Sequence, residues 1–215
     1  MDFKLSASIL NADFLNLEKD IDEVIDSIDE IHFDIMDGSF VNNISYGPQV
    51  LSSLKKKYEK ITFDTHLMID NPSKYWRKFY DAGSDFIVFH YEATPHSYII
   101  LKNIRDANAK SGISITPGTD VSLLKPIKNY IDRILIMTVE PGFGGQKCIP
   151  EMLSKVEKAR KMFDKQVDIE VDGGINDRNI ADFKKAGANV FVVGSYIFKA
   201  NNKKQKALKL KKLIN

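Results

Sequence analysis

Apolar positions along the chain follow two alternating periods. Short runs of β-branched and aromatic residues recur throughout, and each is followed by a segment whose apolar residues have helical spacing. Between the first two runs, for example, apolar residues at positions 17, 21, 24 and 28 form the stripe of a helix that packs on a sheet. The pattern therefore predicts alternating strands and helices, with strands at Phe3–Ile9, Ile31–Met36, Ile61–Met68, Phe86–His90, Gly112–Thr116, Arg133–Val139, Val167–Val171 and Asn189–Val193.

One segment of this pattern occurs twice. Residues 82–89 (AGSDFIVF) and 186–193 (AGANVFVV) lie 104 residues apart, and both have the order helix end, glycine, buried strand. If four strand–helix units separate the two copies, each unit has about 26 residues, and eight units fill about 208 residues. The repeat therefore predicts a single (β/α)8 TIM barrel domain over residues 1–215. A doubly wound parallel sheet is the alternative, because the same alternation builds both.

Composition and charge argue against several classes of partner. The 31 Lys and Arg residues nearly balance 29 Asp and Glu residues, so the net charge of +2 favours neither nucleic acid nor an anionic membrane surface. Six lysines between Lys203 and Lys212 interleave with apolar residues, which is typical of the solvated face of a helix. The chain has one cysteine, no apolar signal core at its start, and no apolar run near the roughly 18 residues that cross a bilayer. We therefore expect a cytoplasmic protein.

Polar side chains gather where the predicted strands end, and barrels of this kind carry their functional residues there. Because side chains alternate across a strand, His32 and Asp34 share one face of the second strand. His66 lies near the end of the third strand, and Asp172 directly follows the seventh. Imidazole and carboxylate groups are ligands of Zn²⁺, Fe²⁺ and Mn²⁺, so the four residues predict a metal site unless each is an interior residue held by hydrogen bonds. His90, at the end of the fourth strand, either hydrogen-bonds a neighbour or touches substrate.

Glycine-rich turns follow the sixth, seventh and eighth predicted strands. Glycine lets the backbone come close to an anion, and barrels of this kind usually bind phosphate beyond strands seven and eight. Neither a Walker A loop nor a Rossmann fingerprint is present. Three methionines on mouth-facing strand positions are either core filler or an apolar wall against a flat anionic intermediate. The residues concerned are Gly142, Gly144, Gly145, Gly173, Gly174, Gly194 and Ser195 in the turns, and Met36, Met68 and Met137 on the strands.

These residues belong to longer stretches in which the chain resembles the ribulose-phosphate 3-epimerase family. The matching stretches cover nearly the full length and are Ser6–Phe14, His32–Val41, His66–Met68, Phe89–Glu92, Val139–Gln146, Val171–Ile175 and Gly194–Ser195. The resemblance implies a barrel of the ribulose-phosphate-binding type that interconverts D-ribulose 5-phosphate and D-xylulose 5-phosphate, a step of the pentose phosphate pathway in carbohydrate metabolism. It implies one divalent metal ion (Zn²⁺, Fe²⁺, Mn²⁺ or Co²⁺) at His32, Asp34, His66 and Asp172. The substrate-binding residues that it implies are Ser8, Met36, His66, Met68, Met137, Gly142, Phe143, Gly144, Gly145, Gly173, Gly174, Gly194 and Ser195.

Departures from the family pattern bear on the substrate rather than on the reaction. Asn42, Cys148 and Tyr196 differ from the family's usual residues, and the last two flank the loop over the mouth and the phosphate end. A close relative that acts on D-allulose 6-phosphate tends to lack the second glycine of two pairs, Gly144-Gly145 and Gly173-Gly174. Both pairs are complete in this chain, which favours the pentulose phosphate over the hexulose phosphate.

Inversion of a carbon next to a ketone requires two acid–base groups that bracket the substrate plane. Asp34 and Asp172 are the expected pair, with a metal stabilising the enediolate and residues 142–145 as a flexible cover. A metal-free barrel lyase or decarboxylase would use a lysine in an Asp-x-Lys-x-x-Asp pattern, and Ile31–Asp37 has no lysine. A non-catalytic phosphosugar-binding barrel is the third possibility, but it has no need of two opposed carboxylates. We also expect the chain to form a homo-oligomer.

Overall fold

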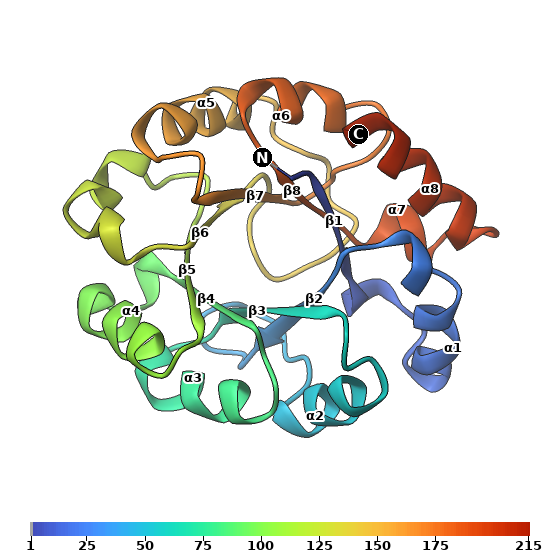
Figure 1. Cartoon of the computed structure of the whole chain (residues 1–215), viewed down its shortest axis with the longest axis horizontal. Coiled ribbons are helices and arrows are strands. Elements are labelled where there is room, and N and C mark those ends of the chain that lie inside the picture. The colour runs from blue at the N-terminus through green and yellow to red at the C-terminus, as the bar shows by residue number, and fades with distance from the viewer. Residues whose placement is uncertain (1) are drawn as a thin grey trace.

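The computed structural model describes residues 2–215, and its eight parallel strands close into a barrel. Each strand pairs with the next along the chain, and β8 also pairs with β1. Figure 1 shows the strands at the centre and the helices around them. The predicted (β/α)8 barrel is therefore confirmed, and the open sheet is excluded. The strands are β1 (Lys4–Ser8), β2 (Glu30–Met36), β3 (Thr62–Met68), β4 (Phe86–His90), β5 (Lys110–Ile115), β6 (Arg133–Met137), β7 (Asp168–Asp172) and β8 (Val190–Val193).

The outer ring consists of α-helices and 3₁₀ helices. The predicted helix over positions 17–28 is divided into α1 and η3, and Ile28 is already extended because the next amide, that of Asp29, donates to the Leu5 carbonyl oxygen (2.9 Å) as the chain enters β2. Within residues 2–215, no helix combines the length and the apolar character needed to cross a membrane. The α-helices are α1 (Leu17–Asp22), α2 (Pro48–Lys57), α3 (Pro72–Asp81), α4 (Ser97–Asp106), α5 (Met152–Met162), α6 (Ile180–Ala186), α7 (Ser195–Phe198) and α8 (Lys203–Ile214). The 3₁₀ helices are η1 (Ile9–Asn11), η2 (Phe14–Asn16), η3 (Ile25–Ser27), η4 (Tyr91–Ala93) and η5 (Val121–Tyr130).

Alternation along the strands separates an apolar outer face from a polar interior. On β2, Ile31 and Phe33 pack into the core between strands and helices, while His32 and Asp34 point into the barrel. The repeated segment also has the predicted structure, since Gly83 before β4 and Gly187 before β8 are both left-handed, with φ of +107° and +113°. A side chain is rarely stable in that conformation, so glycine ends the preceding helix at both places.

Charged side chains fill the barrel at the end where the strands begin. Arg133, the first residue of β6, is fully buried and donates to both carboxylate oxygens of Glu30, the first residue of β2, at 2.7 and 2.8 Å. It also donates to Asp168 of β7 (3.0 Å), and its guanidinium lies 3.8 Å from the ring centroid of Phe86. Asp168 in turn accepts from the Lys4 ammonium (3.0 Å). The guanidinium therefore closes the floor of the barrel by joining strands that are far apart in the sequence.

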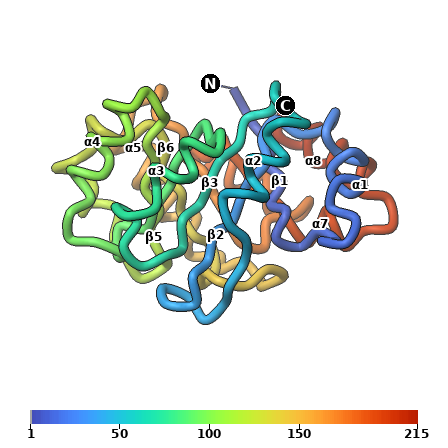
Figure 2. The backbone as a smooth tube through the Cα atoms, turned by 90° about the horizontal axis from the view of Figure 1, so that it is seen from below, coloured from blue at the N-terminus to red at the C-terminus, as the bar shows by residue number. Residues whose placement is uncertain are grey.

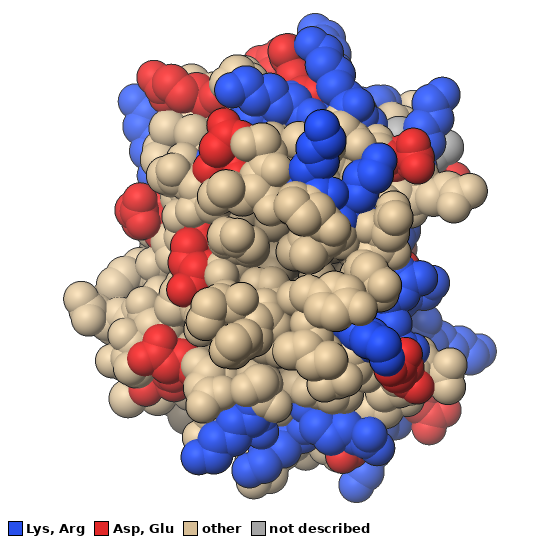
Figure 3. Space-filling model, turned by 90° about the vertical axis from the view of Figure 1, so that its left-hand side faces the viewer, with Lys and Arg blue, Asp and Glu red and all other residues tan. Residues whose placement is uncertain are grey.

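The loops after β2 and β6 lie at the end of the barrel opposite the chain termini. In Figure 2, the loops after β2 and β6 project at the bottom, whereas both termini lie at the top. On the side of α4, charges of both signs surround an uncharged band (Figure 3). Helix α8 buries Ala207, Leu210 and Ile214, and its lysines lie on the solvated side, as predicted.

Candidate active site

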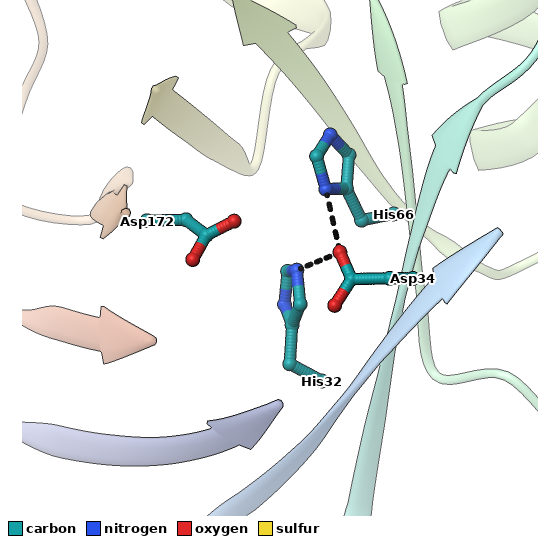
Figure 4. Close-up of side chains that lie close together, drawn as sticks. All are labelled: His32, Asp34, His66 and Asp172. Atoms are coloured by element: carbon teal, nitrogen blue, oxygen red, sulfur yellow. Dashed lines mark hydrogen bonds and ion pairs between the residues drawn. The ribbon is translucent and has the colours of Figure 1, made fainter. Parts of the chain in front are cut away.

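Four predicted residues meet inside the carboxyl end of the barrel. His32 and Asp34 come from β2, His66 comes from β3, and Asp172 is the last residue of β7. The register of β2 on β3 sets Asp34 directly beside His66. One ligand atom from each of the four lies within 4.8 Å of the others. Figure 4 shows Asp172 approaching from the side opposite Asp34 and the histidines.

The two histidines direct a nitrogen toward the same carboxylate oxygen. Asp34 Oδ1 lies 3.3 Å from His32 Nε2 and 3.2 Å from His66 Nδ1. On the far side of its ring, His32 Nδ1 lies 2.8 Å from Asp64 Oδ2. Because a carboxylate can only accept, His32 Nδ1 carries a proton toward Asp64, and replacement of the Nε2 proton by a metal would leave the Asp34 side of the ring as the ligand.

These donor atoms fit a divalent cation. His32 is fully buried, and its Nε2 has no hydrogen-bond partner among the described residues. Burial opposes a charge on His32, yet Asp34 and Asp64 raise its pKa well above the ordinary value, so the ring holds a proton at Nε2 that a metal ion would replace on binding. Burial lowers the pKa of His66 to about 4, which keeps its imidazole in the neutral form that binds metals. Two imidazoles and two carboxylates are ligands that Zn²⁺, Fe²⁺, Mn²⁺ and Co²⁺ accept.

The two aspartates have different proton affinities. Burial alone would raise the pKa of Asp34, but the charge and hydrogen bond of His32 hold it far below the usual range. The Ser8 hydroxyl also donates to Asp34 Oδ2 (2.6 Å). Burial and the nearby Asp34 charge raise the pKa of Asp172 to about 7. Asp34 is thus ionised near neutrality while Asp172 keeps its proton more readily, and a bound cation would lower both pKa values.

One pocket above this cluster brings together nearly all the other predicted residues. Its wall includes the three methionines, and its rim is made by the loops after β6, β7 and β8. His32 and His66 lie beneath this wall, fully buried, although the resemblance implies a substrate contact for His66 as well. The predicted residues that line the pocket are Ser8, Asp34, Met36, Met68, Met137, Gly142, Phe143, Gly144, Gly145, Asp172, Gly173, Gly174, Gly194 and Ser195.

Two of the turn glycines are required by close approach. A Cβ on Gly144 would lie 2.2 Å from Asn11 Oδ1, so the loop after β6 rests directly on the segment after β1. Gly174 has φ of +65°, and a Cβ there would lie 2.5 Å from the backbone nitrogen of Cys148. A larger residue at Gly174 would clash with the backbone of the loop after β6 and change the rim of the pocket, whereas one at Gly144 would displace the Asn11 side chain.

Several residues of the site escaped the sequence analysis. Asn11 lines the pocket, and its place directly after β1 was the available signal, since the ends of the other strands carry polar residues too. Asp64 supports His32, and strand alternation puts it on the same face as His66. His90 hydrogen-bonds His66 and does not line the pocket, which resolves its two sequence interpretations in favour of the first.

Solved structures share this fold. A 3-hexulose-6-phosphate synthase from Salmonella typhimurium matches with a TM-score of 0.76 and 19% identity over 98% of each chain. A 3-keto-L-gulonate-6-phosphate decarboxylase from Vibrio cholerae matches with a TM-score of 0.78 and 16% identity, covering 100% of this chain and 98% of its own. At this level of identity, the comparison shows the barrel fold and nothing about the reaction.

Relatives found by sequence are much more similar to this chain than these solved structures are. The family model described as the ribulose-phosphate 3 epimerase family matches residues 4–198. A ribulose-phosphate 3-epimerase of Buchnera aphidicola is 42% identical over 99% of this chain and 95% of its own. The enzyme of that name from Aquifex aeolicus is 40% identical over 98% of this chain and 96% of its own. The chain belongs to the ribulose-phosphate 3-epimerase family and is an enzyme of the isomerase class.

Proposed function

We propose that this enzyme interconverts D-ribulose 5-phosphate and D-xylulose 5-phosphate, with one divalent metal ion held by His32, Asp34, His66 and Asp172. The observation that carries the proposal is the pair of opposed aspartates at the base of the pocket, whose pKa values are driven apart. The names of the relatives, at about 40% identity over nearly the whole chain, support the substrate. A metal-free lyase is disfavoured because no lysine is among the described residues that line the pocket.

The proposed reaction inverts C3 of the sugar through two proton transfers. Asp34, which is ionised, takes the C3 proton as the C–H bond breaks, and its electron pair moves into the adjoining carbonyl to give an enediolate. Asp172 then delivers a proton to the opposite face of C3, and the two aspartates exchange roles in the reverse direction. The Ser8 hydroxyl fixes the orientation of the Asp34 carboxylate. A divalent ion, when bound, supplies Lewis-acid stabilisation of the negative charge that develops on the substrate oxygens.

The rest of the pocket orients the sugar and excludes water. Gly173, Gly174, Gly194 and Ser195 follow β7 and β8, where backbone amides can bind the phosphate. The side chains of Met36, Met68 and Met137 present an apolar wall to the planar intermediate. The loop with Gly142, Phe143, Gly144 and Gly145 covers the mouth during the reaction.

A coupled assay with metal control tests this function. We expect protein stripped with a chelator to lose more than 90% of its ribulose 5-phosphate epimerase activity, and one equivalent of Zn²⁺, Fe²⁺, Mn²⁺ or Co²⁺ to restore it. D-allulose 6-phosphate is the matched substrate, and we expect a lower kcat/KM for it. Full activity without detectable metal would contradict the metal assignment, and a preference for the hexulose would reassign the substrate. Phosphosugar binding without any turnover would indicate that the protein is a non-catalytic phosphosugar-binding barrel.

We also propose that the chain forms a homo-oligomer. Exposed apolar side chains gather near the mouth, where Phe14, Ile44 and Phe143 line a groove of about 710 Å³ and the neighbouring Leu15 is 94% exposed. A second copy of the chain would shield these side chains from water. Light scattering on the eluting protein should give at least twice the monomer mass, and Leu15→Lys should shift the protein toward monomer. A wild-type monomer at high micromolar concentration would refute the proposal.

A further inference from the structure

His90 lies against the candidate metal site without belonging to it. It is the last residue of β4 and is fully buried, and its Nε2 lies 2.9 Å from His66 Nε2. His66 turns its other ring nitrogen, Nδ1, toward Asp34. The imidazole of His66 therefore has one nitrogen for the metal site and one nitrogen for His90.

Glu92 determines where the protons lie on the imidazoles of His90 and His66. His90 Nδ1 lies 3.3 Å from Glu92 Oε2, and a carboxylate can only accept. The proton of a neutral His90 is then on Nδ1, which leaves Nε2 as an acceptor. His66 must therefore donate from its own Nε2, and its Nδ1 is left as an unprotonated lone pair.

Glu92 is itself held in one orientation. Its Oε1 accepts from the Thr116 amide (2.8 Å), from the Thr116 hydroxyl (3.0 Å) and from the Thr119 hydroxyl. This leaves Oε2 for His90. Although burial would raise the pKa of Glu92, the hydrogen bonds from His90 and Thr119 lower it to about 2. The carboxylate is thus a fixed, ionised acceptor at the end of the chain of hydrogen bonds.

We infer that His90 and Glu92 are positioning residues that hold His66 in the Nε2–H tautomer, so that its Nδ1 is free to bind the divalent ion. The inference rests on the metal site of the proposed function. His32 has a simpler arrangement, since Asp64 accepts from it directly. In other proteins, the partner that accepts from a metal-binding histidine typically changes metal affinity by about 10–100-fold when it is replaced.

Glu92→Gln is the sharpest variant because it should reverse the hydrogen bonds. The Thr116 amide requires an acceptor, so the glutamine oxygen takes the Oε1 position and its NH₂ group faces His90 Nδ1. His90 must then accept at Nδ1 and donate from Nε2. Its Nε2–H would point at the Nε2–H of His66, and this clash disfavours the His66 tautomer whose Nδ1 is free. We expect the dissociation constant for Zn²⁺, measured by competition with a chelating dye, to rise by about 10–100-fold. Epimerase activity should return at saturating Zn²⁺, because neither residue touches the pocket.

The control is Ser84→Ala. Ser84 is buried beside the same two strands, and its hydroxyl donates to Thr65 Oγ1 (2.6 Å), outside the contacts of His66. Its loss should lower stability without changing the affinity for Zn²⁺. If Glu92→Gln behaves in the same way, Glu92 only joins two loops and the inference is wrong, while the proposed function stands.

Nitrogen chemical shifts give a readout that is independent of activity. In the Zn²⁺-loaded wild type, ¹⁵N spectra of the imidazoles should show protons on His66 Nε2 and His90 Nδ1. A proton on His90 Nε2 instead would overturn the inference. A wild type that binds no Zn²⁺ at all would overturn the metal site together with the inference, so the two failures are distinguishable.

Discussion

Asp172→Asn should lower kcat/KM for epimerisation by at least about 10³-fold while leaving the barrel folded, and Asp34→Asn should do the same. An amide preserves the volume of the side chain but can neither accept nor return the C3 proton, and acid–base groups typically contribute about 10²–10⁴-fold. Each substitution also removes one of the four candidate ligands, which adds to the loss. Steady-state assays at saturating metal measure the effect.

The matched control is Asp37→Asn. Asp37 follows β2 just after the site and is exposed; its Oδ1 accepts from the backbone amides of Ser39 and Phe40, which asparagine retains, and its Oδ2 accepts from the Asp70 amide (2.8 Å), which asparagine loses. Its kcat/KM should stay within a few-fold of the wild type. A loss below tenfold in either active-site variant would remove that aspartate from the proposed pair.

A single-turnover reaction in deuterated water distinguishes a two-base mechanism from a one-base mechanism. If Asp34 and Asp172 act from opposite faces, the product of a single turnover should carry about one solvent deuterium at C3. A single base would have to cross the substrate plane and would return part of the original hydrogen. Substantial retention of that hydrogen in the epimerised product would falsify the two-aspartate mechanism.

Arg133→Met should lower the free energy of unfolding by about 3–5 kcal/mol, the cost of leaving buried charges without a partner. The guanidinium is fully buried, and it contacts Glu30, Asp64 and Asp168 at 2.7–3.4 Å. For a chain of this length, each 1 kcal/mol shifts Tm by roughly 2–4 °C, so the loss should exceed about 6 °C. Thermal and urea unfolding monitored by circular dichroism measure the change.

Arg77→Met is the surface counterpart. Arg77 pairs with Asp81 on α3, and both side chains are more than half exposed. Exposed pairs of this spacing contribute about 0.3–0.5 kcal/mol, so Tm should change little. Adding Glu30→Gln to Arg133→Met should restore part of the stability, because it removes one of the stranded charges. Equal shifts in Tm for Arg77→Met and Arg133→Met would show that the buried ion pairs of Arg133 contribute no more to stability than an exposed pair.

The fold was accessible from the sequence because each strand is short, apolar and followed by its own helix. His32, Asp34, His66 and Asp172 could be grouped because strand alternation fixes the face of each residue and parallel strands end on the same side of a barrel. Those two rules use only local information, and the structure brings the four together as they predict.

Contacts that depend on the register between neighbouring strands could not be predicted from the sequence. Arg133 and Glu30 are 103 residues apart, and each begins its strand with nothing in its neighbourhood to indicate the other. The contact of His90 with His66 likewise depends on how β3 and β4 are staggered, which hydrophobic periodicity does not determine. Sequence alone therefore grouped the four candidate residues, but it predicted neither the side chains that support them nor the ion pairs at the floor of the barrel.

The placement of both termini at the end opposite the mouth has a practical consequence. An affinity tag, a fused domain or a surface linker attached at either end would extend away from the pocket, so substrate could still enter freely (Figure 2). Both ends also lie on the same side of the barrel (Figure 2), since α8 packs against β1, so a peptide linker could join them. New termini could then be opened in one of the loops between helix and strand on that side, which would make the chain a suitable scaffold for circular permutation.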